Sequence, residues 1–194
     1  MIKYILKNYS FKEFFVTIAD EYLWSVLKHV PGIEGLLSRR AYLKAFSRSC
    51  GHDVVLERNV FIRCTANLSL GNNVFINRDV HLAAWGGIEI GDNAAIGPRV
   101  VVITNDHKFL TAGTNYQSRQ FVKRPVRIGA NSIIGANCYL NPGVTIGKNC
   151  IVAAGTAVFA DIPDGAQVSG QVCDLYVRNM KKSLKNLSND GEQV

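Results

Sequence analysis

Histidine 107 is the residue whose type and position best fit acid–base chemistry in this chain. It follows a short aliphatic run and opens a long segment, between Val102 and Ile128, that interrupts the repeat described below. Long segments that leave a rigid scaffold often carry function. A neutral imidazole, with an ordinary pKa near ~6.5, can accept a proton from a hydroxyl group near neutral pH. The pattern alone leaves a second interpretation open, a surface histidine without a chemical role.

Metal chemistry and an Asp–His pair fit the sequence less well. Asp106 directly precedes His107, but neighbours in an extended chain point to opposite sides, so we do not expect this carboxylate to orient the imidazole. A zinc site needs three clustered ligands, and we therefore expect no metal. The four histidines are scattered without ligand spacing: His29, His52, His81 and His107.

The cysteines also point away from metal and disulfide chemistry. Their number is odd and their spacings match no zinc pattern. We expect reduced cysteines that pack inside the fold of a cytoplasmic protein. The five are Cys50, Cys64, Cys138, Cys150 and Cys173.

A six-residue repeat must supply the scaffold that positions His107. An aliphatic residue is often followed by glycine, and a small or branched residue stands four places on. A short strand with an inward aliphatic side chain, then a tight corner, explains both positions. Three strands close one coil, and stacked coils share a core, so we predict a mainly β fold, a parallel β-helix from about Leu56 to Val158. The regular aliphatic positions are Ile128, Ile134, Leu140, Ile146, Val152 and Val158.

The same phase extends toward the N-terminus with small slips. The steps from Ile62 to Leu70 and from Leu82 to Ile90 are eight residues long, which predicts a two-residue bulge at a corner. A helical alternative fails, because Gly-Asp-Asn, Gly-Ala-Asn and Gly-Lys-Asn segments would break a helix about every six residues.

The two ends of the chain differ from the repeat. We expect an N-terminal helical segment over residues 1–50, with one amphipathic helix through Val26 and a second from Leu36 to Arg48. The β-helix domain then covers residues 51–170, with a protruding loop over 105–125. Residues 171–194 are expected to form a helix that closes the open base, followed by a tail.

The repeat, the interrupting loop with its histidine, and the segment Asn141-Pro142-Gly143-Val144-Thr145-Ile146-Gly147 resemble the hexapeptide-repeat acyltransferases. The branch they resemble is the sugar O-acetyltransferases, which includes galactoside, maltose, capsule and O-antigen acetyltransferases. The resemblance covers about Leu56 to Gly170. It implies a left-handed β-helix and a homotrimer with active sites between subunits. It also implies acetyl-CoA as the acyl donor, with its pantetheine arm lying along the coils.

The resemblance assigns roles to individual residues. His107 falls where the family has its catalytic base, and Asn77 matches an asparagine that contacts the acceptor. Asn77 fits a corner position without a functional role equally well. Binding of the CoA donor is implied for Ala136, Ala153, Ala154, Thr156 and Arg178.

Some positions depart from the family pattern. Ile133 stands where the family has a tryptophan, Gln120 lies near the place of an acidic residue, and Ala160 replaces a lysine that helps to hold the CoA phosphates. The terminal family pattern is also replaced, by Gly170-Gln171-Val172-Cys173-Asp174. These departures keep open an altered acceptor (an amino sugar, an antibiotic or serine) or a trimeric scaffold without catalysis.

Charge bears on the acceptor and on partners. The formal net charge is +7, and residues 1–50 hold eight Lys/Arg against four Asp/Glu. The stretch from Tyr22 to Gly51 resembles the N-terminal segment of capsule and O-antigen acetyltransferases, which implies a surface-polysaccharide sugar as acceptor. The basic, aromatic helix either rests on an anionic membrane surface or packs on the β-helix or a neighbouring subunit. No apolar run is long enough to span a membrane, and no interleaved aromatic pattern favours nucleic acid.

Overall fold

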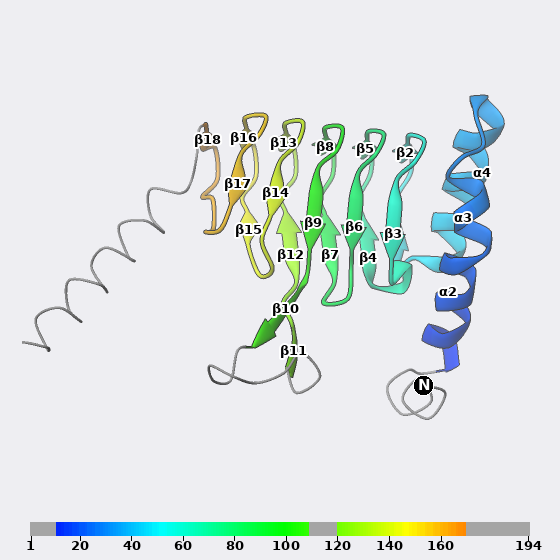
Figure 1. Ribbon diagram of the computed structural model, residues 1–194. Helices are drawn as coiled ribbons and strands as arrows, with labels where there is room; N and C mark the ends of the chain where they lie inside the picture. The colour runs from blue at the N-terminus through cyan, green and yellow to red at the C-terminus, as the bar shows by residue number, and fades with distance from the viewer. Residues whose placement is uncertain (1–10, 109–119, 170–194) are drawn as a thin grey trace, which may run out of the picture.

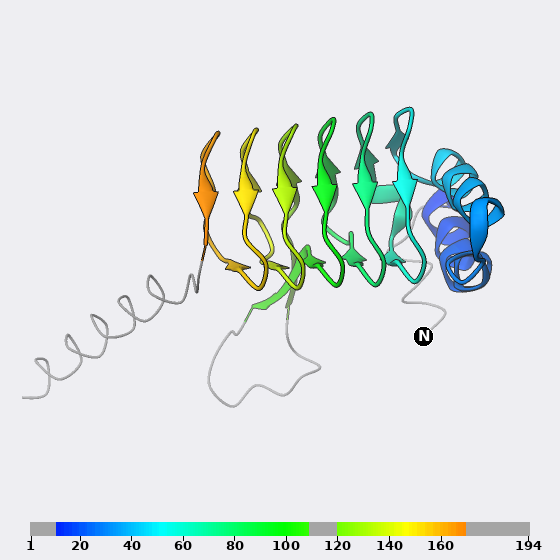
Figure 2. The same ribbon diagram turned by 90° about the horizontal axis from the view of Figure 1, so that it is seen from above.

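The computed structural model describes residues 11–108 and 120–169, with side chains from Phe15 to Asp106 and from Val122 to Ser169. Three parallel sheets form the faces of a prism, and the chain passes from sheet A to sheet B to sheet C in every coil (Figures 1 and 2). This is the predicted parallel β-helix. Sheet A contains β1 (Ser49–Cys50), β4 (Leu68–Leu70), β7 (Ile88–Ile90), β12 (Val126–Ile128) and β15 (Thr145–Ile146).

The other two faces have the same short strands. Sheet B contains β2 (Val55–Leu56), β5 (Phe75–Ile76), β8 (Ala95–Ile96), β13 (Ile133–Ile134), β16 (Ile151–Val152) and β18 (Gln167–Val168). Sheet C contains β3 (Phe61–Arg63), β6 (His81–Ala83), β9 (Val101–Ile103), β14 (Tyr139–Leu140) and β17 (Ala157–Val158).

The aliphatic residues of the repeat form buried columns inside the prism. In sheet B, Ile76 pairs with Leu56 on one side and Ile96 on the other, and all three are at most 1% exposed. The strands alternate between an outward and an inward side chain, as a two-residue strand must. Each coil therefore buries its aliphatic residues only against the coils above and below it.

The coils extend further than the aliphatic pattern predicted. Cys50 takes the inward position of sheet A in the first coil. At the other end, Ile162 pairs with Ile146 of sheet A and Val168 pairs with Val152 of sheet B. The aliphatic pattern ends too early for two reasons. Cys50 replaces an aliphatic residue at the N-terminal end, and the step from Val158 to Ile162 is shorter than six residues. The eight-residue step from Ile62 to Leu70 contains a 3-10 turn, η1 (Thr65–Asn67).

Asparagine side chains form a ladder of hydrogen bonds along the corner between sheets A and B. Asn73, Asn93, Asn131 and Asn149 all have positive φ, a conformation that asparagine adopts at lower cost than most residues. The Nδ2 of each of the first three donates to the Oδ1 of the asparagine in the next coil, at 3.0, 3.0 and 3.1 Å. This ladder explains why asparagine recurs in the repeat.

Three helices cover the N-terminal end of the prism (Figures 1 and 2): α2 (Phe11–Glu21), α3 (Leu23–Leu27) and α4 (Gly32–Phe46). The single helix expected through Val26 is interrupted at Tyr22, and the second helix begins before Leu36. Pro31 and Gly32, with a φ of +72° at the glycine, set the start of α4.

A buried arginine joins α4 to the first coil. Arg39 is 1% exposed, and its Nε donates to the carbonyl oxygen of Leu56 at 2.9 Å. Its Nη1 donates to the carbonyl oxygens of Val30 at 2.8 Å and Leu27 at 3.3 Å. Burial lowers the pKa of this guanidinium. One side chain thus ties the α3–α4 connection to the first strand of sheet B.

A second buried contact joins α2 to the prism. The carboxylate of Asp20 accepts hydrogen bonds from the hydroxyl of Tyr42 at 2.7 Å, and from the backbone N–H of Thr65 at 3.1 Å. Burial raises the pKa of Asp20, while the hydrogen bonds from Thr65 and Tyr42 act in the opposite direction. Trp24 adds a bond from Nε1 to the carbonyl oxygen of Val60 at 3.0 Å.

An antiparallel hairpin leaves the prism between sheets C and A. It consists of β10 (Asn105–Lys108) and β11 (Gln120–Lys123), and it projects away from the coils in Figure 1. The protruding segment expected over 105–125 thus begins as a paired ribbon. The expected C-terminal helix over 171–194 lies outside the described residues. Within the described part of the chain, no helix is long and apolar enough to cross a membrane.

Replacement of Arg39 by methionine is expected to destabilise the protein by about 3 kcal/mol or more, because three carbonyl groups lose their donor in a buried place. Arg40→Met is the matched control. Its side chain is 30% exposed and pairs with Asp53 at 3.7 Å, so the cost should stay within about 1 kcal/mol. Urea unfolding followed by circular dichroism measures both. Equal losses for the two variants would contradict the role given to Arg39.

Candidate active site

Asn77 lies at the corner between sheets B and C. Its Oδ1 accepts a hydrogen bond from the backbone N–H of Arg78 at 2.8 Å, and its own N–H donates to the carbonyl oxygen of Ile96 at 2.9 Å. The side chain is half-buried. Its Nδ2 has no hydrogen-bond partner among residues 11–108 and 120–169. Asn77 therefore shapes its corner and keeps an amide donor free, so the structural and the acceptor-binding interpretations are compatible.

Small residues occupy the same corner in the last two complete coils. Gly135, Ala136, Ala153 and Ala154 follow β13 and β16, and none carries a side chain larger than methyl. A Cβ on Gly135 would collide with the backbone nitrogen of Ala154, so this glycine is required by the spacing of the coils. The result is a smooth shelf of backbone and methyl groups, defined here as the alanine shelf.

Thr156 does not present its side chain on the alanine shelf. It is 1% exposed, and its hydroxyl donates to the carbonyl oxygen of Ala153 at 2.7 Å inside the prism. Its hydroxyl thus supports the shelf from within. Sequence reasoning placed this threonine both in the core of the repeat and at the donor site, and the structure shows the core position. Arg178 lies outside the described residues.

His107 lies on the hairpin, at a different corner from Asn77. It is part of β10, and its backbone is opposite Phe121 of β11. The hairpin leaves the corner between sheets C and A, whereas Asn77 and the alanine shelf lie on the corner between sheets B and C. A strand of sheet C, roughly 7–10 Å of chain, separates the two corners in each coil. One chain alone does not bring these residues together.

The outer side of sheet C, between the two corners, is half-buried and largely apolar. His81 stacks on Phe61 with ring centroids 4.5 Å apart, and burial, together with the charge of Arg63, lowers its pKa. Tyr139 lies 5.9 Å from Phe159 by ring centroids. Burial raises the pKa of Tyr139, and the nearby Asp106 carboxylate adds to this effect.

Sheet B carries exposed apolar side chains on its outer side. Phe75 is 39% exposed, Ile133 is 50% exposed and Ile151 is 43% exposed. Ile133 and Ile151 stand in the neighbouring strands β13 and β16, and β8 separates them from Phe75 in β5. Ile133 is the position where the family has a tryptophan. Contiguous exposed apolar side chains often mark a surface that contacts a partner or ligand.

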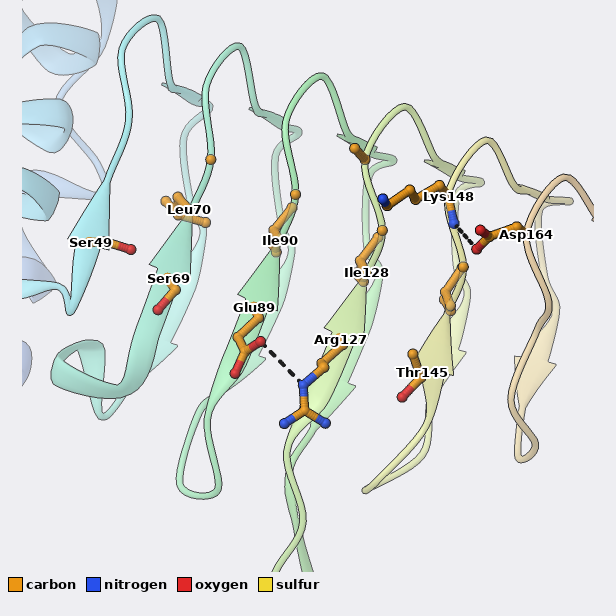
Figure 3. A pocket seen from close by; sticks show the side chains of 16 residues that line it. Ser49, Ser69, Leu70, Glu89, Ile90, Arg127, Ile128, Thr145, Lys148 and Asp164 are labelled. Atoms are coloured by element: carbon orange, nitrogen blue, oxygen red, sulfur yellow. Dashed lines mark hydrogen bonds and ion pairs between the residues drawn. The ribbon is translucent and has the colours of Figure 1, made fainter.

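A groove of about 620 Å³ runs along sheet A, and none of the predicted site residues lines it. Figure 3 shows its outward residues in a row, one for each strand, with Arg127 Nε 3.2 Å from Glu89 Oε2. A glycine follows each strand of this sheet, where a Cβ would collide with the backbone of the next coil. Sequence reasoning missed the groove, since its residues lie far apart in the chain and meet only when the coils are stacked. They are Ser49, Ser69, Glu89, Arg127 and Thr145.

Metal and disulfide chemistry find no support in the described part of the chain. No three His, Cys, Asp or Glu side chains there lie close enough to hold an ion. The four cysteines whose surroundings are described are free: Cys50, Cys64, Cys138 and Cys150.

The fold and the repeat define the class of protein. The family described as hexapeptide repeat of succinyl-transferase matches residues 125–160. The solved structure of a maltose O-acetyltransferase from Clostridium difficile 630 superposes with a TM-score of 0.73 at 28% identity, covering 83% of this chain and 84% of that one. A galactoside acetyltransferase solved in complex with coenzyme A gives a TM-score of 0.75 at 25% identity, covering 84% of this chain and 80% of the other.

Sequence comparison points the same way. Galactoside O-acetyltransferase of Escherichia coli K12 is 29% identical over 138 residues, which are 70% of this chain and 66% of that protein. The matched segments span between about a quarter and two thirds of the length of the curated relatives. The fold is the left-handed β-helix of hexapeptide repeats, as predicted. In its repeat and its fold the chain is similar to the hexapeptide-repeat acetyltransferases.

Proposed function

We propose that this protein is an acetyl-CoA-dependent O-acetyltransferase that acts on a sugar hydroxyl. The observation that carries the proposal is the hairpin that interrupts the β-helix at His107, in a chain whose coils superpose on a maltose O-acetyltransferase. The similarity to the galactoside O-acetyltransferase of Escherichia coli supports a sugar as acceptor. The coenzyme A complex of another galactoside acetyltransferase supports a CoA donor, and no metal is part of the proposal.

The proposed chemistry follows from the residues at the two corners. His107 accepts the proton of the acceptor hydroxyl while that oxygen attacks the thioester carbonyl carbon of acetyl-CoA. The tetrahedral intermediate collapses, the C–S bond breaks, and the CoA thiolate takes up the proton from the imidazolium. Asn77 contacts the acceptor through its free amide donor. The pantetheine arm lies on the alanine shelf, against Ala136, Ala153 and Ala154, and Arg178 is the proposed ligand of the CoA phosphates.

The site is proposed to form between two subunits of a homotrimer. In one chain, sheet C separates the corner of His107 from the corner of Asn77 and the alanine shelf. Threefold symmetry brings the second corner of one subunit to the first corner of its neighbour, which completes each site with residues from two chains. The exposed Phe75, Ile133 and Ile151 and the apolar sheet C supply surface for these contacts.

The acceptor is proposed to be a sugar of a surface polysaccharide (capsule, O-antigen or exopolysaccharide), modified in the cytoplasm at the inner face of the membrane. The N-terminal helices support this place. Their outer side exposes large apolar residues, and residues 1–50 carry an excess of positive charge. Such a surface suits the headgroup region of an anionic bilayer. The residues are Phe15, Ile18, Tyr22, Leu23, Val26, Ile33 and Leu37.

Replacement of His107 by alanine is expected to lower acetyl transfer by about 10² to 10⁴, the usual loss when a general base is removed. Free thiol release from acetyl-CoA in the presence of maltose, galactosides and amino sugars measures the rate. His52→Ala is the control. His52 lies at the corner between sheets A and B, where its Nδ1 is 2.9 Å from Asp53 Oδ2. If His107→Ala is as active as the parent, the base is another group. If the parent neither releases thiol nor binds CoA, the protein is a scaffold.

Two inactive variants are expected to complement each other. His107→Ala and Asn77→Ala chains, coexpressed with different tags in equal amounts, form some sites with both residues intact. Random assembly of trimers restores roughly a quarter of the parent activity, because each site draws one residue from each of two chains. Activity of the purified mixture is compared with that of each variant alone. Absence of restored activity in hybrids that contain both tags would place the whole site within one chain.

The N-terminal helices are expected to bind anionic vesicles. The variant Ile33→Ser/Leu37→Ser removes two side chains that are 68% and 62% exposed, and should reduce co-sedimentation with phosphatidylglycerol vesicles several-fold. The control Ala41→Ser/Ala45→Ser introduces serine at two exposed positions of α4 without removing a large apolar side chain, and it should retain binding. Equal binding by both double variants, or no binding by the parent, would show that the helices serve another partner.

A further inference from the structure

Three arginines stand together on the corner between sheets B and C. Arg58 and Arg78 occupy the same position in successive coils, and the third is Arg99 in the coil that follows. The backbone N–H of Asp79 donates to the carbonyl oxygen of Arg58 at 3.2 Å, and the N–H of Arg99 donates to that of Arg78 at 3.2 Å. All three side chains are exposed. We call this group the arginine corner.

Arg99 stands in a position that disfavours arginine. Its φ is +58°, the left-handed region, where the Cβ of an ordinary residue meets the following carbonyl oxygen. The other coils fill this position with residues that tolerate such a backbone: Asn59, Asp79, Asn137 and Gly155. A strained residue in an otherwise regular series indicates that its side chain is needed there for a reason other than the fold.

The guanidinium groups of the arginine corner are available to a ligand. Arg99 Nε donates to the Oδ1 of Asn137 at 2.8 Å, which orients the group and leaves its two terminal nitrogens without a partner in the described part of the chain. Arg58 and Arg78 form no ion pair with any residue of 11–108 or 120–169. The acidic residues nearby are Glu57 and Asp79, so positive charge is in excess even before Lys28 is counted. Lys28 adjoins the corner through a bond from the Asn59 N–H.

The arginine corner surrounds the proposed acceptor residue. Asn77 directly precedes Arg78 and accepts its backbone N–H at 2.8 Å. Arg58 lies one coil before this pair and Arg99 one coil after it, whereas the alanine shelf begins a further coil on. A sugar held at Asn77 therefore has arginine side chains in the coils before and after it, and the Arg99 guanidinium is oriented by Asn137. Arginine is the side chain best suited to phosphate oxygens, which it binds by paired, charge-assisted hydrogen bonds.

We infer that the acceptor is a sugar linked to a diphosphate, whose phosphate oxygens bind Arg58, Arg78 and Arg99 while the sugar hydroxyl is acetylated. This inference rests on the proposed acetyltransferase function and narrows its substrate. A nucleoside diphosphate sugar and a polyprenyl diphosphate sugar share this chemistry. Phosphate is recognised but not transferred, so the reaction consumes acetyl-CoA and the sugar hydroxyl and releases CoA, with the diphosphate unchanged.

The test compares acceptors that share galactose and differ in the group on its anomeric oxygen, which is absent, one phosphate or a diphosphate ester. Galactose, galactose 1-phosphate, UDP-galactose and farnesyl diphosphate-linked galactose are offered with acetyl-CoA, and thiol release gives kcat and KM for each. The diphosphate acceptors should exceed galactose in kcat/KM by at least roughly a hundredfold, which corresponds to two well-placed charged contacts at about tenfold each. Inhibition by UDP alone or by farnesyl diphosphate alone, competitive with the acceptor, shows which of the two sources is used.

Variants then assign the effect to the arginine corner. Arg58→Ala/Arg78→Ala should raise KM for the diphosphate acceptor at least about tenfold and leave KM for acetyl-CoA and for galactose unchanged. Arg127→Ala, an exposed arginine on sheet A, is the control and should behave as the parent. Arg99→Asn provides a sharper test. Asparagine suits the left-handed backbone and can pair with Asn137 as in the ladder, so the melting temperature should stay or rise while the acceptor KM rises.

Some results would overturn the inference while leaving the acetyltransferase function intact. Galactose could be acetylated as efficiently as UDP-galactose, or the double variant could raise KM for acetyl-CoA in place of the acceptor. If no acceptor is turned over, the proposed function fails, and calorimetric binding of UDP-galactose decides the inference by itself. Binding that is lost in Arg58→Ala/Arg78→Ala and kept in Arg127→Ala supports a diphosphate site. Absence of binding to the parent protein rejects it.

Discussion

The stacking of equivalent positions, coil upon coil, is the constraint on which the other features depend. Ile76 lies between Leu56 and Ile96, and a shift of one residue would turn every later aliphatic side chain to the outside. Strands of two or three residues cannot absorb an insertion, so added residues must enter at corners. The 3-10 turn η1 and the β10–β11 hairpin both lie at the corner between sheets C and A. The core thus dictates where a segment carrying a catalytic residue can leave the scaffold.

The exposed end of a β-helix imposes a second requirement, since its first strands offer unpaired backbone groups. The helices answer it with buried polar contacts: Arg39 binds three carbonyl groups, and Asp20 joins Tyr42 to the turn at Thr65. Trp24 and Leu43 are buried beside these contacts, whereas other large apolar side chains of α2 to α4 stay exposed. Sealing the coil end and presenting a surface to a partner are therefore two consequences of the same packing.

The fold could be read from the sequence because the aliphatic period and the corner residues each predict the same coil. The position of His107 was also accessible, as a break in that period. The aliphatic period alone stopped short of both ends, because Cys50 replaces an aliphatic residue and the step to Ile162 is shortened. Thr156 holds a buried position of the repeat, and its implied contact with the CoA donor stays a prediction. The arginine corner was invisible, since Arg58, Arg78 and Arg99 become neighbours only through stacking, and no local pattern marks a left-handed arginine.

The stacking of corners also sets the distances between groups along the prism axis. Equivalent positions in a parallel sheet recur about every 4.8 Å along the axis, so the separation between Asn77 and the alanine shelf comes in whole coils. A substitution can alter what a coil presents, but the two groups change their spacing only when a complete coil of three strands is gained or lost. Point mutations can therefore change which ligands such a protein binds. The distance between its two substrates changes only when a whole coil is inserted or deleted.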